Sequence, residues 1–382
     1  MQYRELGRTG LMVSEIGMGC EGFVAQEGAL TEPLIDAMEQ AGVNYIDLYT
    51  PDAGMRTRLG KALRGRREKF ILQGHLCTIW KDGQYQRTRR IDEVKAGFED
   101  LLARLETDSV EVGMIHYVDS LEDWEAVSQG PVLAYARELK AQGKIRHIGL
   151  SSHNPQAALA AVESGAIEVL MFSVNPCYDL QPAGEDIEAL WADESYADHL
   201  VNMDPDREAL YETCSRLGVG ITVMKGYAGG RLFAESTSPF GVALTPVQCI
   251  HYVLTRPAVA SILAGYDTPE HVMAAVAYET ASEEERDYAS ILAGAPRHAY
   301  SGQCTYCGHC APCPKGIDIA MVNKLYDLAV MQPQVPESIR AHYQALNAGA
   351  EDCIACGNCE KRCPFGVPVI HRMEKVKELH LL

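Results

Sequence analysis

The stretch KIRHIGLSSHNPQAALAAVES, residues 144–164, contains the repeating unit that decides the fold. Lys144–Ser151 is a short, mainly apolar run of strand length, and a segment of helical length and pattern follows it. Asn154 is a preferred helix N-cap residue, and Pro155 suits the first helical turn because the backbone N–H that it lacks would have no partner there. The stretch therefore predicts a β-strand joined by a tight turn to an α-helix, Pro155–Ser164.

The same alternation runs through the first 295 residues. Seven further strands are predicted, at Glu15–Gly19, Val43–Leu48, Lys69–Gly74, Ser109–His116, Glu168–Val174, Val219–Met224 and Val259–Gly265. The other segments of helical pattern are Thr31–Ala41, Met55–Leu63, Ile91–Leu105, Pro131–Ala141, Asp206–Leu217, Thr245–Thr255 and Pro269–Thr280. Eight such units, without Gly-x-Gly-x-x-Gly after the first strand, favour an α/β fold of the (β/α)8 TIM barrel type over a doubly wound sheet. A hairpin of Tyr3–Leu6 and Leu11–Val13 is expected to close the bottom of the barrel.

Eight of the 13 cysteines lie in two arrays near the end of the chain. One reads Cys304-x-x-Cys307-x-x-Cys310-x-x-Cys313-Pro, and the other reads Cys353-x-x-Cys356-x-x-Cys359-x-x-x-Cys363-Pro. The second array has the spacing with which bacterial-type ferredoxins hold iron–sulfur clusters, and the first is one residue shorter before its last cysteine. Three thiolates two residues apart can bind one face of a cluster, whereas the fourth, which precedes Pro, points to the other cluster.

We therefore expect two [4Fe–4S] clusters with exchanged fourth ligands. One is assigned to Cys304, Cys307, Cys310 and Cys363, and the other to Cys353, Cys356, Cys359 and Cys313. Zinc would explain Cys-x-x-Cys pairs, but not four evenly spaced cysteines twice with Pro after each fourth. Residues 296–382 are thus predicted to form a small ferredoxin-like iron–sulfur domain, with a helical insertion at Pro314–Asp352, behind a barrel domain of residues 1–295.

The composition excludes several classes of protein. With 382 residues, 47% hydrophobic and 23% charged, the chain is too long for a disulfide-stapled miniprotein and too apolar for a disordered chain. Its net charge of −18 argues against nucleic acid or an anionic membrane as a partner. Because residues 301–382 hold eight basic and eight acidic side chains, this charge belongs to the barrel. The chain has neither an apolar run of about 18 residues nor an apolar leader, so we expect no membrane span and a cytoplasmic location.

In a (β/α)8 barrel the chemistry lies at the carboxyl ends of the strands. The residues expected there are Asp47, His75, His116, Ser151, Ser152, His153, Asn154, Asn175, Cys177, Lys225 and Gly265. Titratable groups that converge on one rim are typical of an active site. Two loops are expected either to shape a substrate pocket or to be solvated excursions: Leu76–Arg90, with Trp80, Tyr85, Arg87, Arg89 and Arg90, and Cys177–Asp206, with Tyr178, Trp191 and Tyr196.

Several segments of the first 295 residues carry a family resemblance. They are Arg4–Gly19, Gly42–Asp47, Leu59–Leu63, Met114–His116, Gly143–Gly149 and Gly218–Lys225. In these segments the chain resembles the aldo-keto reductase family, and with the cysteine arrays it resembles the ferredoxin-tailed branch of that family. The resemblance implies a catalytic Asp, Tyr, Lys and His beside a bound nicotinamide, and Asp47 and His116 match the Asp and the His. Ser151 stands at the position of the family's serine for the nicotinamide amide, and together with the rim residues Ser152, Asn175, Lys225 and Gly265 it is expected to contact the cofactor.

The sequence departs from the family pattern at the other two catalytic positions. Asp52 stands where the Tyr is expected, and His75 stands where the Lys is expected. In the family's usual arrangement the Lys lowers the pKa of the Tyr, which then protonates the forming alkoxide. His75 and His116 could replace this acid because imidazole titrates near the working pH. Tyr49 is the nearest phenol, and a residue two positions after Asp47 on a strand points to the same face.

Three functions therefore compete. The first is a nicotinamide-dependent oxidoreductase, in which His116 and His75 donate the proton and Asp47 orients them. The second is an oxidoreductase that reduces a small organic substrate, a carbonyl or a related compound, with electrons that a ferredoxin or flavoprotein delivers through the clusters. The third is an electron-transfer or scaffold protein whose barrel has lost NADP(H)-dependent reductase activity. The missing Tyr and Lys favour the second function, whereas Ser151 and Lys225 support the first.

Overall fold

The computed structural model describes residues 1–381 except 82, 185, 191, 197–199, 201, 297–299, 332 and 333. Trp191, which the sequence placed in a pocket-shaping loop, therefore lies outside the described residues. Eight parallel strands close into a barrel in the order β3-β4-β5-β8-β9-β10-β11-β12. They are β3 (Ile16–Met18), β4 (Tyr45–Leu48), β5 (Ile71–Leu76), β8 (Val110–Ile115), β9 (Ile145–Ser152), β10 (Val169–Ser173), β11 (Gly220–Met224) and β12 (Val259–Ala264). The predicted (β/α)8 fold class is confirmed.

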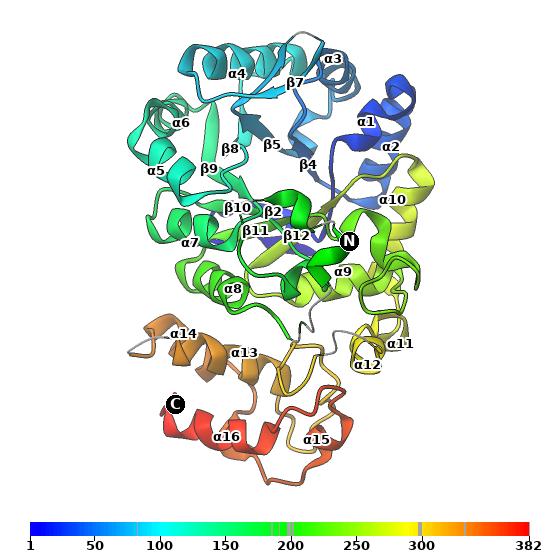
Figure 1. The fold of residues 1–382 in the computed structure, drawn as a ribbon, viewed down its shortest axis with the longest axis vertical. Coiled ribbons are helices and arrows are strands. Elements are labelled where there is room, and N and C mark those ends of the chain that lie inside the picture. Colours follow the sequence, from blue (N-terminus) through cyan, green and yellow to red (C-terminus); the bar gives the residue numbers. More distant parts are fainter. Residues whose placement is uncertain are drawn as a thin grey trace.

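Helices surround the barrel at the predicted places (Figure 1). They are α2 (Thr31–Ala41), α3 (Ala53–Ala62), α4 (Ile91–Leu105), α6 (Pro131–Ala141), α7 (Pro155–Glu163), α8 (Pro205–Leu217), α9 (Pro246–Thr255) and α10 (Pro269–Val276). The Asn154 side chain accepts hydrogen bonds from the backbone N–H groups of Gln156 and Ala157, as an N-cap residue should. Unpredicted elements are α1 (Glu21–Val24), α5 (Leu121–Gln129), α11 (Glu283–Arg286), α12 (Ala289–Ala293) and a hairpin of β6 (Thr78–Lys81) and β7 (Gln84–Arg87).

The amino-terminal hairpin of β1 (Tyr3–Glu5) and β2 (Met12–Ser14) supplies the bottom of the barrel interior. Leu6, Leu11 and Val13 are buried in the same apolar cluster as the inward-facing strand residues Tyr45 and Met114. Gly7 has a positive φ of 58°, and a Cβ atom there would lie 2.4 Å from the carbonyl oxygen of Gly218. Only glycine permits this close approach. Because the hairpin closes the bottom of the barrel, the open end is the opposite one, at the carboxyl ends of the strands.

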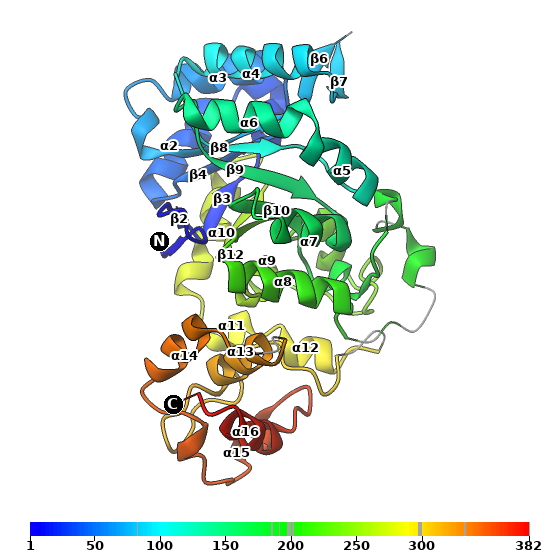
Figure 2. The same ribbon diagram turned by 90° about the vertical axis from the view of Figure 1, so that its left-hand side faces the viewer.

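The carboxyl-terminal domain consists of cysteine-bearing loops and four short helices. These are α13 (Ile319–Val330), α14 (Glu337–Gln344), α15 (Asn358–Arg362) and α16 (Val369–Glu378). Figures 1 and 2 show the domain against one flank of the barrel, beside α8, α11 and α12. The Gln303 amide donates to Oε1 of Glu208 on α8 at 3.0 Å, which ties the first cysteine loop to the barrel. No helix in the described part of the chain combines the length and apolar character needed to cross a membrane.

Candidate functional site

A cavity of about 580 Å³ lies at the carboxyl ends of the barrel strands. The sequence-predicted residues among its walls are Asp47, Tyr49, His75, His116, Ser151, His153, Lys225 and Gly265. Tyr85 also lines the cavity, from the unpredicted hairpin, and Phe233 lines it from the 3-10 helix Ala228–Phe233. The structure thus brings together all four side chains predicted to be catalytic, although they come from β4, β5 and the loops after β4 and β8.

Three hydrogen bonds join four of these side chains into one chain. Oδ1 of Asp47 lies 2.7 Å from Nε2 of His75, and Nδ1 of His75 lies 2.6 Å from Nδ1 of His116. Nε2 of His116 lies 2.7 Å from the hydroxyl oxygen of Tyr85. Asp47 and His75 are 1% exposed, whereas Tyr85 is 37% exposed, so the chain leads from the barrel interior to the cavity. We refer to Asp47, His75, His116 and Tyr85 as the relay.

When both histidines are neutral, the Asp47 carboxylate decides which atom of each hydrogen bond in the relay is the donor. A carboxylate only accepts hydrogen bonds, so Nε2–H of His75 donates to Asp47 and Nδ1 of His75 becomes an acceptor. His116 then donates from Nδ1 and accepts the Tyr85 hydroxyl proton at Nε2. Burial, and then electrostatic repulsion between the two adjacent histidines, holds the pKa of His116 well below its usual value. The relay therefore rests with both histidines neutral, and His116 readily gives up an added proton.

Residues deeper in the barrel hold the buried end of the relay. Gln73, on β5, donates from Nε2 to Oδ1 of Asp47 at 2.6 Å. The amide oxygen of Gln73 accepts hydrogen bonds from the Tyr45 hydroxyl at 2.7 Å and the Thr222 hydroxyl at 3.2 Å. Because Oδ1 of Asp47 also accepts from Gln73, and Gln73 is itself held by Tyr45 and Thr222, Asp47 cannot turn away from His75 without breaking both of its hydrogen bonds.

The loops carry the exposed end of the relay. Arg89 donates to the carbonyl oxygens of His116 and Tyr117, each at 2.8 Å, and pairs with Asp123. The Arg87 guanidinium lies 3.6 Å from the centre of the Tyr117 ring. These contacts join the β6–β7 hairpin to the loop after β8. The loop Leu76–Arg90 therefore shapes the pocket, as one of the two sequence interpretations expected, and it does so by presenting Tyr85.

Tyr85 is the residue whose position sequence reasoning missed. The sequence placed it only in a pocket-shaping loop, yet its hydroxyl ends the relay. A local signal was available, because Lys81-Asp82-Gly83-Gln84 contains the Asp-Gly pair typical of a two-residue hairpin between two alternating segments. Tyr49 also lines the cavity, and burial raises its pKa. Among the described residues no hydrogen bond connects Tyr49 with the relay.

The residues predicted to contact a cofactor divide into two groups. Ser151, Lys225 and Gly265 line the cavity. Ser152 and Asn175 lie behind it and are 0% exposed; the Asn175 side chain donates to the carbonyl oxygen of Lys225 and accepts from the backbone of Tyr178. Cys177, expected at the rim, is also buried, and burial raises its pKa to about 12. Such a thiol is not a ready nucleophile.

The charges in the cavity give little support to a dinucleotide phosphate. Lys225 is the one lysine or arginine among the described lining residues, and burial lowers its pKa. Two carboxylates, Glu21 and Asp47, share the cavity with it. Helix α10, which begins near Gly265, carries Glu270 in its first turn, where a bound phosphate would otherwise find backbone donors. The residues present suit a nicotinamide amide better than they suit its phosphates.

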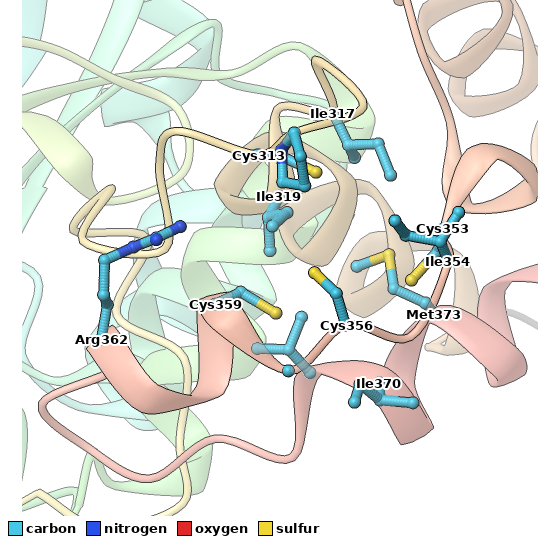
Figure 3. Close-up of a pocket in the computed structure, with 13 residues that line it drawn as sticks. Cys313, Ile317, Ile319, Cys353, Ile354, Cys356, Cys359, Arg362, Ile370 and Met373 are labelled. Atoms are coloured by element: carbon cyan, nitrogen blue, oxygen red, sulfur yellow. The ribbon is translucent and has the colours of Figure 1, made fainter.

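The eight cysteines of the two arrays surround two small cavities in the carboxyl-terminal domain. Cys304, Cys307, Cys310 and Cys363 line one, which we call the barrel-side centre. Cys313, Cys353, Cys356 and Cys359 line the other, which we call the outer centre. Figure 3 shows the four cysteines of the outer centre around its cavity, with apolar residues such as Ile317 and Met373 beside them. Four thiols around each cavity fit a [4Fe–4S] cluster.

Comparison with known proteins assigns each of the two domains to a family. Residues 15–244 match the Aldo/keto reductase family, and residues 303–368 match the 4Fe-4S dicluster domain. The uncharacterized oxidoreductase YqkF of Bacillus subtilis (strain 168) is 27% identical over 304 residues, covering 74% of this chain and 94% of that protein. Aldo-keto reductase YhdN of the same bacterium is 30% identical over 195 residues, covering 47% of this chain and 54% of that protein.

Solved structures agree on the fold. The holo form of aldo-keto reductase AKR11C1 from Bacillus halodurans matches with a TM-score of 0.60 at 23% identity, over 75% of this chain and 94% of that one. A putative aldo-keto reductase from Pseudomonas aeruginosa, PA4992, matches with a TM-score of 0.54 at 24% identity, over 72% and 94% of the two chains. Because one family covers residues 15–244, the chain belongs to the aldo/keto reductase family. It is an oxidoreductase of this type with a 4Fe-4S dicluster domain.

Proposed function

We propose that the protein reduces a small carbonyl or related compound in the barrel cavity, with electrons supplied through two [4Fe–4S] clusters and a proton supplied by the relay. The observation that carries this proposal is the unbroken hydrogen-bond chain from Asp47 to the Tyr85 hydroxyl at the cavity wall. Reduction of one carbonyl to an alcohol takes up two electrons and two protons. Two clusters, each a one-electron carrier, match the number of electrons; the relay supplies the proton on oxygen, and water in the cavity supplies the proton on carbon. Cys304, Cys307, Cys310 and Cys363 would hold one cluster, and Cys353, Cys356, Cys359 and Cys313 the other.

The relay explains how the oxygen of the substrate receives its proton. When His116 holds an added proton, its Nε2–H donates to the Tyr85 oxygen, and the Tyr85 O–H is free to face the substrate. As Tyr85 gives its proton to the substrate oxygen, the proton on Nε2 of His116 moves to Tyr85, and His116 returns to the neutral form. The Asp47 carboxylate stabilises the protonated histidine pair through its hydrogen bond with His75. The relay thus does the work that the family's Tyr and Lys would do.

A nicotinamide-dependent reductase is the second candidate. It is supported by Ser151 and Lys225 in the cavity wall, and opposed by Glu21 in the same wall and Glu270 at the start of α10. A scaffold without turnover is a weaker alternative. Burying polar groups such as Asp47 and His75 costs stability, and buried side chains cannot contact a docked partner, so a scaffold would gain nothing from them.

Anaerobic titration with NADPH separates the candidates. We expect no saturable binding and no reduction of the clusters at millimolar NADPH, whereas reduced ferredoxin should reduce them. Hydride-dependent reduction of the clusters by NADPH would replace our proposal with the second candidate. Full turnover in a His116→Ala variant would exclude the relay as the proton source under either electron donor.

A further inference from the structure

Arg256, the C-cap residue of α9, carries a buried charge that acts electrostatically on the carboxylates of Asp179 and Glu208 but forms no ion pair with either. Its side chain is 1% exposed. The other fully buried arginines have acidic neighbours: Arg56 lies 3.4 Å from Asp100, and Arg207 lies 3.9 Å from Asp179. Among the described residues no carboxylate lies within ion-pair distance of Arg256. Asp179 is shared with Arg207, so Arg256 has no carboxylate of its own, and a further negative group close by would stabilise its buried charge.

The contacts of Arg256 lead to the barrel-side centre. Its guanidinium donates to the carbonyl oxygen of Thr305 and lies 3.4 Å from the Tyr288 hydroxyl. The same guanidinium lies over the rings of Tyr252, at 4.4 Å, and Tyr306, at 5.9 Å. Thr305 and Tyr306 are the two residues between Cys304 and Cys307. Arg256 therefore lies directly behind the loop that would hold the barrel-side cluster.

The groups in direct contact with Arg256 do not balance its charge, because the Asp179 and Glu208 carboxylates are not within ion-pair distance. A carbonyl oxygen, two tyrosine rings and the carboxyl end of α9 offer only partial negative charge. A [4Fe–4S] cluster with four thiolate ligands carries about two net negative charges, and a third when it is reduced. We infer that Arg256 is the counter-charge of the barrel-side cluster and stabilises its reduced form, a role that rests on the proposed ligand sets. Arg256 thus acts on the midpoint potential of this cluster through its charge, from behind the cysteine loop.

The outer centre has no equivalent group among the residues that line it. Its described walls include the apolar residues Ile317, Ile354 and Met373. Arg362 lines it as well, but this side chain is exposed and donates to the carbonyl oxygens of Cys310 and Pro312. In Figure 3 Arg362 lies on the opposite side of the cavity from Cys353. We therefore expect Arg256 to affect one cluster and leave the other unchanged.

Potentiometric titration of the cluster-loaded protein, followed by electron paramagnetic resonance, tests this inference. Arg256→Gln should lower the midpoint potential of one cluster by at least about 59 mV, which corresponds to a tenfold change in the ratio of oxidised to reduced cluster for one electron. Arg256→Lys, which keeps the charge, should stay within that interval. Tyr288→Phe is the matched control, because the Tyr288 hydroxyl donates to the same Thr305 carbonyl oxygen at 3.1 Å, and removing this neutral group should move neither potential.

The affected signal must also belong to the correct cluster. Cys310→Ser should shift or abolish the signal that responds to Arg256→Gln, and Cys356→Ser should shift or abolish the other one. The reverse pattern, or equal potentials in wild type and Arg256→Gln, would overturn the inference. Should Arg256→Gln not fold, Arg256→Lys decides, because a tenfold fall with the charge retained would also overturn it. A chain with about eight irons and unmoved potentials refutes this inference alone, whereas far fewer irons refute the two-cluster proposal with it.

Discussion

Tyr85→Phe is the change that most directly interrupts the relay. The substitution removes the hydroxyl that lies 2.7 Å from Nε2 of His116 and keeps the ring. Tyr85 is 37% exposed, so the loss of one oxygen leaves no buried cavity. The folding cost is about 1–3 kcal/mol, because Nε2 of His116 loses its hydrogen-bond partner in a mainly buried position.

The effect on turnover should be far larger than the effect on folding. Loss of a positioned general acid lowers kcat by roughly 10²–10⁴-fold, or about 3–5 kcal/mol of transition-state stabilisation. KM should change little, because the proton transfer belongs to the transition state and not to binding. The assay is anaerobic reduction of a panel of carbonyl compounds by the ferredoxin-reduced protein. Cluster spectra of the variant must match wild type, so that the loss of rate is assigned to the barrel.

Tyr49→Phe is the matched comparison, because Tyr49 is a second phenol in the same cavity wall. Our account predicts that Tyr49→Phe keeps most of the rate that Tyr85→Phe loses. The reasoning is refuted if Tyr85→Phe stays within threefold of wild type, whatever Tyr49→Phe does. A substrate-free check is nitrogen NMR of the oxidised protein, which should show His75 protonated at Nε2 and His116 protonated at Nδ1.

Three further changes test other parts of the account. Asp47→Asn should lower kcat by roughly 10²-fold, because the amide no longer stabilises the protonated histidine pair; steady-state rates that match wild type would contradict this. For oxidation of the product alcohol, kcat/KM should stay level as the pH falls through 6.5 and decline only at lower pH, since burial and the neighbouring His75 hold the pKa of His116 well below its usual value and the neutral imidazole is the base. An inflection at or above pH 6.5 that His116→Ala removes would refute this assignment. Cys313→Ser should alter the paramagnetic signal of the outer centre and leave that of the barrel-side centre intact, and the reverse result would reject the exchanged fourth ligands.

The fold could be predicted because each strand–helix unit of the barrel has local sequence signals. Residues 144–164 contain a strand-length apolar run, an N-cap and a proline at the first helical turn, and the structure has β9, the Asn154 cap and α7 there. The strand ends then follow from topology alone, since parallel strands in a barrel all point to one rim. This is why Asp47, His75 and His116 could be grouped from the sequence although they are far apart in the chain.

The position of Tyr85 could not be derived in the same way. It depends on how far the β6–β7 hairpin leans over the rim, which Arg89 sets through its bonds to the backbone of His116 and Tyr117. The role of Arg256 depends on packing between domains, because α9 and the cysteine loop that meets it are about 50 residues apart in the chain. No sequence period or spacing reports contacts of this kind. Residue type alone also misplaced Cys177, which is buried and does not line the cavity.

The central claim is that electrons held by the clusters reach a substrate beside Tyr85. Single-turnover stopped-flow measurement tests it most directly: the protein is fully reduced without NADPH and mixed anaerobically with the carbonyl panel. The account predicts that at least one compound reoxidises both clusters, with two electrons consumed per alcohol formed, and that Tyr85→Phe slows this reoxidation by roughly 10²-fold or more. Clusters that stay reduced with every compound, while NADPH supports turnover of the same panel, would contradict it.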